Sequence, residues 1–320
     1  MLPDKRTAAW KLALSSCGRG IPVALLYVVE SKGSSPGRRG FYMVVNAGGE
    51  MEGSIGGGIM EHKLTEMVRE QLRRGEGILA LRRQVHDKEA VRDQSGMICS
   101  GEQTVLLYSF RGEDRVTLRR LLDSLLSYGH GWLKLSPAGM EFLEEGEGLT
   151  EGMVAGVDWM YQERTGYRDR LYIVGGGHCA LALSRLARGM DFYITLFDDR
   201  SGLGSLDRNE YVHEKVLVES YAGLSGQIAG GEHHYVVVMT QGYRTDDIAV
   251  RVLLPINFRY FGLLGSSAKI GKMLAGYRAE GIAEERLRRL RAPAGLAIHS
   301  QTPEEIAISI MGEMIAVRNG

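Results

Sequence analysis

Two glycine-rich turns are the segments of this chain that are best suited to chemistry. Gly53–Gly58 lies near the N-terminus, and Gly175–Gly177 lies past the middle and is followed at once by His178. Each turn follows an apolar, strand-like run and opens a helix-like one. A helix N-terminus carries unpaired N–H groups and partial positive charge, and glycine lets an anion approach the backbone closely. The pair predicts a protein that holds a large anionic small molecule, with two domains sharing it.

The second turn has the context of a nucleotide-binding motif. The apolar run Leu171–Val174 leads into Gly175, and the spacing G-x-G-x-x-A ends at Ala180. The next apolar run ends at Asp198, close to the roughly 20 residues expected for an acid that binds a ribose. This pattern predicts one half of a Rossmann-type fold. Whether a dinucleotide binds stays open, because such folds also keep the turn for packing. The choice between NAD and NADP stays open too, because Arg200, two residues after Asp198, could accept the 2′-phosphate of NADP.

His178 and Cys179 open the helix that follows this turn. The helix dipole disfavours a charged imidazole there, so we expect His178 to be neutral and to face the ligand cleft. The alternative is a surface histidine without a role. For Cys179, small-residue packing is the favoured interpretation, although a thiolate would be stabilised at this position.

Polar residues also follow two later strand-like runs. Gln241 and Asp246 come after Tyr235–Thr240, and Ser266 comes after Tyr260–Leu264. Doubly wound sheets bind their ligands at the carboxyl ends of parallel strands. We therefore expect these three side chains at the ligand, with ordinary helix capping as the alternative for Asp246 and Ser266.

The first turn lacks the G-K-[ST] ending of a nucleoside-triphosphate-binding loop, and Glu61 follows on the first turn of its helix. Cys99 lies in another small-residue turn, where its thiol is accessible if it is not simply buried and inert. A soft thiolate suits a transition-metal centre, so Cys99 is the candidate metal ligand. The three cysteines in the chain indicate neither a disulfide framework nor a CxxC metal site.

Length and composition narrow the class of protein. The chain has 320 residues, which predicts two domains. Lys plus Arg and Asp plus Glu both number 39, and this balance argues against a general nucleic-acid binder. No apolar run approaches the roughly 20 residues that span a bilayer, and the N-terminal segment is typical of an amphipathic helix rather than a secretion signal. We expect a cytoplasmic protein with neither a membrane nor a nucleic-acid partner.

The periodicity divides the chain into three parts of an α/β protein. Residues 1–110 alternate strand-like and helix-like runs and predict an α+β domain. Residues 111–169 begin with an amphipathic helix, turn acidic and glycine-rich, and are interpreted as a connector with hairpins. Residues 170–320 alternate strands and helices regularly, which predicts a Rossmann-like doubly wound parallel sheet. Thr302–Glu305 predicts the start of the last helix through a capping box with proline at its first position.

Taken together, these motifs resemble the XdhC/CoxI family, the accessory factors of xanthine dehydrogenase and related molybdenum hydroxylases. The resemblance covers nearly the whole chain. It is carried by Gly33–Pro36, Gly53–Gly58 with Glu61, Cys99, Gly175–His178, Asp198–Arg200, Thr240–Asp246, Leu264–Ser266, and Ala292-Pro293 through Thr302–Ala307. The chain departs from the family pattern at Gly37, Ser100, Gln241 and Ser267. These departures weaken the transfer of any single catalytic role from the family, and they leave open that the chain serves a different hydroxylase.

The resemblance implies that the protein binds molybdenum cofactor (molybdopterin), supports its sulfuration and delivers it into a molybdenum hydroxylase apo-enzyme, as a homodimer. A cysteine desulfurase is a further partner that the sequence leaves open. The protein would then be an accessory factor without a catalytic residue of its own. Cys99 would lie near the metal. The walls of the site would be formed by Gly56, Gly57, Gly58 and Glu61 in front, and by Gly175, Gly177, His178, Asp198, Gln241, Asp246 and Ser266 behind.

Two other classes of function compete with this interpretation. The G-x-G-x-x-A turn with Asp198 is also typical of an NAD(P)-dependent oxidoreductase whose first domain binds substrate. No Tyr-x-x-x-Lys or similar acid–base pair stands at a strand end to support it. The other alternative is a regulatory protein that uses NAD(P) or another nucleotide only as a signal.

Overall fold

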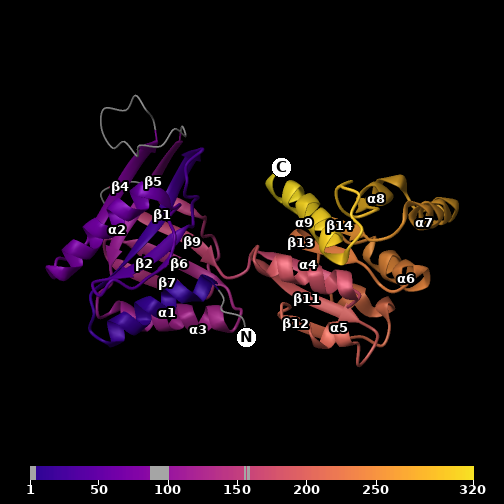
Figure 1. The fold of residues 1–320 in the computed structure, drawn as a ribbon, viewed down its shortest axis with the longest axis horizontal. Helices are drawn as coiled ribbons and strands as arrows, with labels where there is room; N and C mark the ends of the chain where they lie inside the picture. Colours follow the sequence, from indigo (N-terminus) through magenta and orange to yellow (C-terminus); the bar gives the residue numbers. More distant parts are fainter. Residues whose placement is uncertain (1–4, 87–100, 155, 157–158) are drawn as a thin grey trace. The chain divides into compact units, whose positions relative to one another are not determined.

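A computed structural model describes residues 5–86, 101–154, 156 and 159–320, and it divides the chain into two compact units (Figure 1). The first unit is Pro3–Gly166 and the second is Tyr167–Gly320. Within the described residues, no helix is long and apolar enough to cross a membrane.

The first unit is organised around an antiparallel sheet with strand order β3-β2-β1-β5-β4. Its central strand β1 is buried on both faces, because alternate side chains enter two different cores. Val23, Leu25, Tyr27 and Val29 face one core, whereas Ala24, Leu26 and Val28 face the other. The strands are β1 (Val23–Gly33), β2 (Tyr42–Asn46), β3 (Met51–Gly53), β4 (Leu79–His86) and β5 (Gly101–Ser109).

Three helices and a second sheet complete this unit. Helix α2 (Gly58–Arg73) buries Leu64, Val68 and Leu72 in one of the two cores. Helices α1 (Lys5–Gly18) and α3 (Asp114–Leu126) line the other core together with an antiparallel sheet of order β7-β6-β9-β8. That sheet consists of β6 (Gly131–Ser136), β7 (Gly139–Leu143), β8 (Gly152–Val154) and β9 (Met160–Thr165). The segment 111–169, interpreted from sequence as a connector, is divided between the units: residues 111–166 lie in the first unit and contain a helix and a complete sheet, and residues 167–169 lie in the second.

The second unit is a six-stranded sheet of order β12-β11-β10-β13-β14-β15, and all of its strand pairs are parallel. This is the strand order of a Rossmann fold, so the predicted fold class is confirmed. The strands are β10 (Asp169–Val174), β11 (Phe192–Asp198), β12 (Glu214–Leu217), β13 (Gly231–Val238), β14 (Phe258–Leu263) and β15 (Leu290–Arg291).

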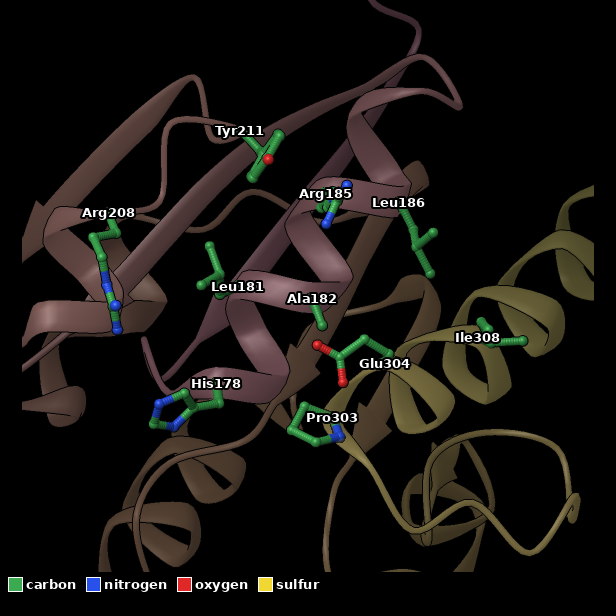
Figure 2. Close-up of a pocket in the computed structure, with 10 residues that line it drawn as sticks. All are labelled: His178, Leu181, Ala182, Arg185, Leu186, Arg208, Tyr211, Pro303, Glu304 and Ile308. Carbon is green, nitrogen blue, oxygen red and sulfur yellow. The ribbon is translucent and has the colours of Figure 1, made fainter.

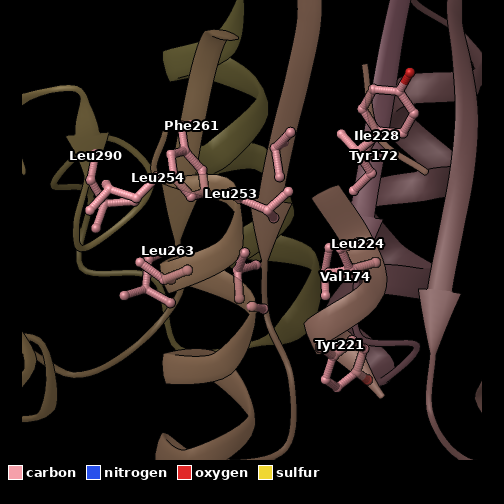
Figure 3. Packing of buried hydrophobic residues seen from close by; sticks show 14 of the residues in the cluster. Tyr172, Val174, Tyr221, Leu224, Ile228, Leu253, Leu254, Phe261, Leu263 and Leu290 are labelled. Atoms are coloured by element: carbon pink, nitrogen blue, oxygen red, sulfur yellow. The ribbon is translucent and has the colours of Figure 1, made fainter. Parts of the chain in front are cut away.

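Separate cores form on the two faces of this sheet. On one face, Leu253, Leu254 and Tyr221 pack against strand residues such as Val174 and Phe261 (Figure 3). The elements on that face are η1 (Tyr221–Gly226), α6 (Tyr243–Leu253), α7 (Ser267–Ala279) and α8 (Glu284–Arg288). The other face is covered by α4 (His178–Arg188), α5 (Gly204–Asp207) and α9 (Pro303–Asn319).

The order of the strands decides where the candidate site residues meet. Strand order reverses between β10 and β13, which are direct neighbours in the sheet. The turn at Gly175 leaves β10, and the turn at Thr240 leaves β13, at the same carboxyl edge. Ligands of doubly wound sheets bind at this reversal point. Helix α9 begins at Pro303 with the predicted capping box between Thr302 and Glu305.

Candidate functional site

The turn between β10 and α4 requires glycine at its first position. Gly175 has φ +107°, and a Cβ atom there would lie 2.5 Å from the carbonyl oxygen of Met239. The neighbouring strand therefore approaches the turn too closely for any side chain. At Gly176 a Cβ would lie 3.2 Å from Oδ2 of Asp198, so the second glycine also serves close packing.

The third glycine is different, because the fold itself does not demand it. Gly177 has φ −71°, which every residue adopts, and nothing lies within 4 Å of the position of its Cβ. It is the N-cap residue of α4, and no side chain caps this helix. The open space therefore lies over uncapped first-turn amides, which can receive an anionic group. His178 is exposed beside them, which fits a residue that meets a ligand and equally fits the alternative of a surface histidine.

Asp198 is fully occupied by its own chain. Its buried carboxylate accepts hydrogen bonds from the amides of Gly176 (2.6 Å) and Arg200 (2.9 Å). The guanidinium of Arg200 adds two more, at 2.8 Å from Nε and 2.7 Å from Nη2. Burial alone would raise the pKa of the Asp198 carboxyl, but these hydrogen bonds outweigh burial and hold the pKa below its usual value. A ribose hydroxyl would have to displace Arg200 to reach Asp198.

Arg200 links this cluster to the next strand end. Its Nη1 donates to Oε1 of Gln241 at 3.2 Å, so Gln241 lies on the same network as Asp198. The structure thus brings the turn after β10, the end of β11 and the turn after β13 together through hydrogen bonds. The sequence-predicted residues Gly175, Asp198 and Gln241 are all at this edge.

Asp246 and Ser266 are also at the carboxyl edge, and both bond to their own chain. The buried carboxylate of Asp246 accepts from the amide of Thr240 (3.0 Å) and from its hydroxyl (2.6 Å), and it forms an ion pair with Lys269. Ser266 caps α7 by accepting from the amide of Lys269 at 3.3 Å. Ser266 therefore matches the capping alternative. Asp246 does not, because α6 has Gly242 as its N-cap residue and no side-chain cap; its carboxylate instead links the end of β13 to Lys269.

The first glycine turn is closed by Glu61. One oxygen of this carboxylate, Oε2, accepts from the amides of Ile55 (2.8 Å) and Gly57 (2.9 Å) and from the hydroxyl of Ser54 (2.7 Å). The amide of Gly56 donates to the hydroxyl of Ser54 at 3.1 Å. An anionic ligand would therefore have to replace Glu61 at the amides that the sequence suggested for it.

Three segments of the first unit pack around that turn. A Cβ atom on Gly37 would lie 2.2 Å from the carbonyl oxygen of Ile55, and one on Gly56 would lie 2.4 Å from the amide of Gly37. Oε1 of the buried Gln103 accepts from the amide of Gly37 at 2.9 Å. Glycine at position 37, one of the departures from the family pattern, is therefore required by the close approach of these loops. Sequence reasoning did not identify Gln103, because nothing in a single strand residue signals this contact.

Cys99, the candidate metal ligand, lies outside the described residues. Among the residues that are described, no group of three or more His, Cys, Asp or Glu side chains could hold a metal ion. Cys179 is half-buried at the start of α4, and burial raises the pKa of its thiol, with the charge of Glu304 as a second cause. This agrees with the structural interpretation of Cys179.

His178 also lines a cavity of about 520 Å³ in the second unit (Figure 2). Sequence reasoning identified none of its other lining residues as ligand contacts, although Pro303 and Glu304 belong to the motif that predicts the start of α9. Arg185 could have been found, since it follows His178 by seven residues and so lies on the same side of α4. Arg208 and Tyr211 come from an irregular segment without a comparable signal.

Fold and site together define a protein with an antiparallel first unit and a Rossmann-type second unit with an open, uncapped helix N-terminus at its reversal point. Comparison with known families agrees with this class. Residues 171–314 match the XdhC Rossmann domain, and residues 17–83 match the XdhC and CoxI family. The chain belongs to the XdhC/CoxI family.

Individual relatives share this relationship at low identity. The uncharacterized protein YqeB of Escherichia coli K12 is 26% identical over 315 residues, covering 98% of this chain and 46% of that protein. A probable xanthine dehydrogenase subunit of Bacillus subtilis 168 is 27% identical over 159 residues, covering 50% of this chain and 46% of that protein. The chain thus spans about half the length of the curated relatives it matches.

A solved structure supports the fold as a whole. The crystal structure of a xanthine dehydrogenase from Bacillus halodurans superimposes with a TM-score of 0.72 at 23% identity, covering 97% of this chain and 96% of that one. At this identity the similarity establishes the shared architecture of both units and nothing about activity.

Proposed function

We propose that this protein binds molybdenum cofactor and supports its maturation and insertion into a xanthine dehydrogenase-type molybdenum hydroxylase. Family membership and the name of the Bacillus subtilis relative support the association with such an enzyme. The structural observation that carries the binding role is the open space at Gly177 over the uncapped amides of α4.

The two glycine turns differ in how well they fit the anionic part of such a cofactor. Molybdopterin brings a phosphate, together with the sulfur ligands and the oxo and sulfido groups of the metal that a hydroxylase uses. At α4, the amides that follow Gly177 are uncapped and His178 lies beside them, so this turn fits a phosphate. At α2, Glu61 already takes two of the loop amides. We therefore assign the phosphate to the turn at Gly177.

The remaining roles rest on the resemblance to the XdhC/CoxI family. We propose that Cys99 supplies a thiolate to the metal, that the chain acts as a homodimer, and that its partners are the apo-hydroxylase and a cysteine desulfurase. Replacement of Cys99 by serine should reduce activation of the hydroxylase and leave the melting temperature unchanged. Undiminished activation would assign this thiol a structural role.

A substitution at Gly177 tests the binding role without damaging the fold. Aspartate fits the backbone of Gly177 and is a favourable N-cap residue, so Gly177→Asp should leave stability unchanged or slightly higher. Its carboxylate would occupy the first-turn amides and repel an anion. Gly204→Asp, at the start of α5 where nothing lies within 4 Å of the Cβ position, adds the same charge elsewhere in the unit.

The measurement is equilibrium binding of molybdopterin under anaerobic conditions. We expect Gly177→Asp to bind molybdopterin at least about tenfold more weakly than wild type, because the new carboxylate takes the place of the phosphate at the helix amides. The Gly204→Asp variant should bind like wild type. Equal binding by all three proteins would exclude the turn at Gly177 as the phosphate site.

The strand order and the turn at Gly175 also favour a nucleotide, and an NAD(P)-dependent oxidoreductase is therefore the second candidate. The saturated carboxylate of Asp198 argues against it, because a ribose has no free acceptor there. Titration with NADH and NADPH, followed by cofactor fluorescence, separates the two. Saturable binding of either nucleotide, together with hydride transfer to a substrate, would favour the oxidoreductase function over the proposed role in cofactor maturation.

A further inference from the structure

The cavity beside α4 is built from three separate segments of the second unit. Figure 2 shows it over the outer side of α4, with Pro303, Glu304 and Ile308 of α9 on one side and Arg208 and Tyr211 on the other. Its volume of about 520 Å³ lies in the range of small-molecule sites. A cavity of this kind suits a small molecule better than a single ion.

The walls of the cavity are largely apolar. Leu181, Ala182 and Leu186 line it from α4, and Ile308 lines it from α9. Ile308 is 56% exposed, which leaves a large aliphatic side chain in contact with water. Covering this surface with the apolar body of a ligand is favourable, at about 25 cal/mol per Å² of apolar area removed from water.

The charges around these walls favour an anion. Two arginines line the cavity, Arg185 and Arg208, and its lining residues include one acidic side chain, that of Glu304. Within the part of the chain that the structure describes, neither arginine forms an ion pair, although most of the ion pairs found there involve arginine. Glu304 lies in the first turn of α9, where the helix dipole already accounts for an acidic side chain. Arg208 donates from Nε to the carbonyl oxygen of Gly204 at 3.0 Å, and both arginines are exposed. Two guanidinium groups and one carboxylate around an apolar wall thus favour a ligand of negative charge.

This cavity extends well beyond the turn assigned to the cofactor phosphate. Arg185 lies seven residues after His178 on α4, which corresponds to roughly 10 Å along the helix axis. His178 is the one lining residue that also borders the turn. The cavity is therefore a second site, and the inference below does not rest on the proposed cofactor role.

We propose that the cavity between α4, α9 and the Arg208–Tyr211 segment binds a small organic anion. Its apolar ring or chain lies on Leu181, Ala182 and Ile308, and its carboxylate or phosphate group bonds to Arg185. Arg208, on the other side of the cavity, adds to the positive charge. The guanidinium fork matches the two oxygens of such a group. The ligand would be a metabolite-sized molecule.

Two probes of equal shape and different charge test this proposal. We would titrate the full-length protein with 2-naphthoate and with its neutral isostere 2-naphthamide, and follow binding by calorimetry. Saturable binding of one naphthoate per chain is expected, with the amide weaker by about tenfold because it lacks the charge. Equal affinity for the two probes, or no saturable binding of naphthoate, would overturn the proposal.

Two variants of one helix locate the site. Arg185→Gln should weaken naphthoate by about tenfold and leave naphthamide unchanged, since only the charged contact is lost. Arg188→Gln removes the same charge from a residue of α4 that does not line the cavity, and it should bind like wild type. Equal losses in the two variants would reduce the effect to general electrostatics and refute the assigned site. Ile308→Ser should weaken both probes alike, and unchanged binding would contradict the placement of the apolar group.

Discussion

The strongest structural prediction concerns Asp198, which the structure makes a stabilising residue. In Asp198→Asn, either orientation of the amide turns an NH₂ group toward two of the four donors that now face the carboxylate. Breaking a buried charged pair costs about 3–5 kcal/mol. The Arg200 side chain is 29% exposed, so water compensates part of the loss and we expect the lower end, about 3 kcal/mol.

The two units allow this effect to be localised. All three tryptophans lie in the first unit, at positions 10, 132 and 159, so their fluorescence follows that unit alone. Asp198→Asn should lower the melting transition of the second unit, observed by circular dichroism, by about 6–12 °C. The tryptophan transition should not move. Asp207→Asn, an exposed acid in α5, is the matched control and should shift neither.

A shift below about 2 °C in Asp198→Asn would refute this reasoning, since a loss of about 3 kcal/mol cannot produce so small a change. It would mean that Arg200 and Gly176 find other partners without loss, and Asp198 would then be free to serve a ligand. An equal shift in Asp207→Asn would attribute the effect to net charge rather than to the buried network.

Three further substitutions test the other contacts. Glu61→Gln should destabilise the first unit by about 1 kcal/mol, because the side-chain amide accepts more weakly than the carboxylate from the loop donors. The measurement is urea unfolding followed by tryptophan fluorescence. No change in stability would show that the loop closes without the carboxylate. Gly37→Ala should lower the stability of the first unit by at least about 2 kcal/mol in the same assay, since its Cβ would lie 2.2 Å from the carbonyl oxygen of Ile55. The control Gly77→Ala, where nothing lies within 4 Å of the Cβ position, should leave stability unchanged. Equal effects of the two variants would contradict the close packing at Gly37. Burial and the charge of Arg170 lower the pKa of His234 below its usual value of 6.5. Because the unfolded chain then takes up the proton more readily than the folded one, the second unit should lose stability as the pH falls below about 6.5, and His234→Phe should remove this loss. A pH dependence that is the same in the variant would assign the titration to another group.

Much of the second unit could be predicted because its signals are local. Apolar runs ending in glycine or an acidic residue marked the strands β10 and β11, and the capping box at Thr302 marked the start of α9. Regular alternation of strands and helices was enough to predict a parallel sheet. The predicted site residues of this unit lie at one edge because the strand order places β10 beside β13.

The parts that could not be predicted depend on contacts between distant residues. Residues 111–166 gave weak signals, since their short strands become a sheet only by packing on α1 and α3. The closure of the first glycine turn by Glu61 involves backbone amides, which no sequence pattern distinguishes from an open anion site. The residues of the cavity come from three segments. The starts of α4 and α9 carried recognisable motifs, but no sequence pattern indicates that these helices form a cavity together with Arg208 and Tyr211.

The most direct test of the central claim is the identity of the small molecule that the wild-type protein releases when it is purified anaerobically and then denatured. Our proposal predicts a molybdopterin, recognised by the fluorescence of its oxidised derivatives and accompanied by molybdenum. Release of a nicotinamide nucleotide, or of no pterin at all from protein prepared in cells that make the cofactor, would contradict it.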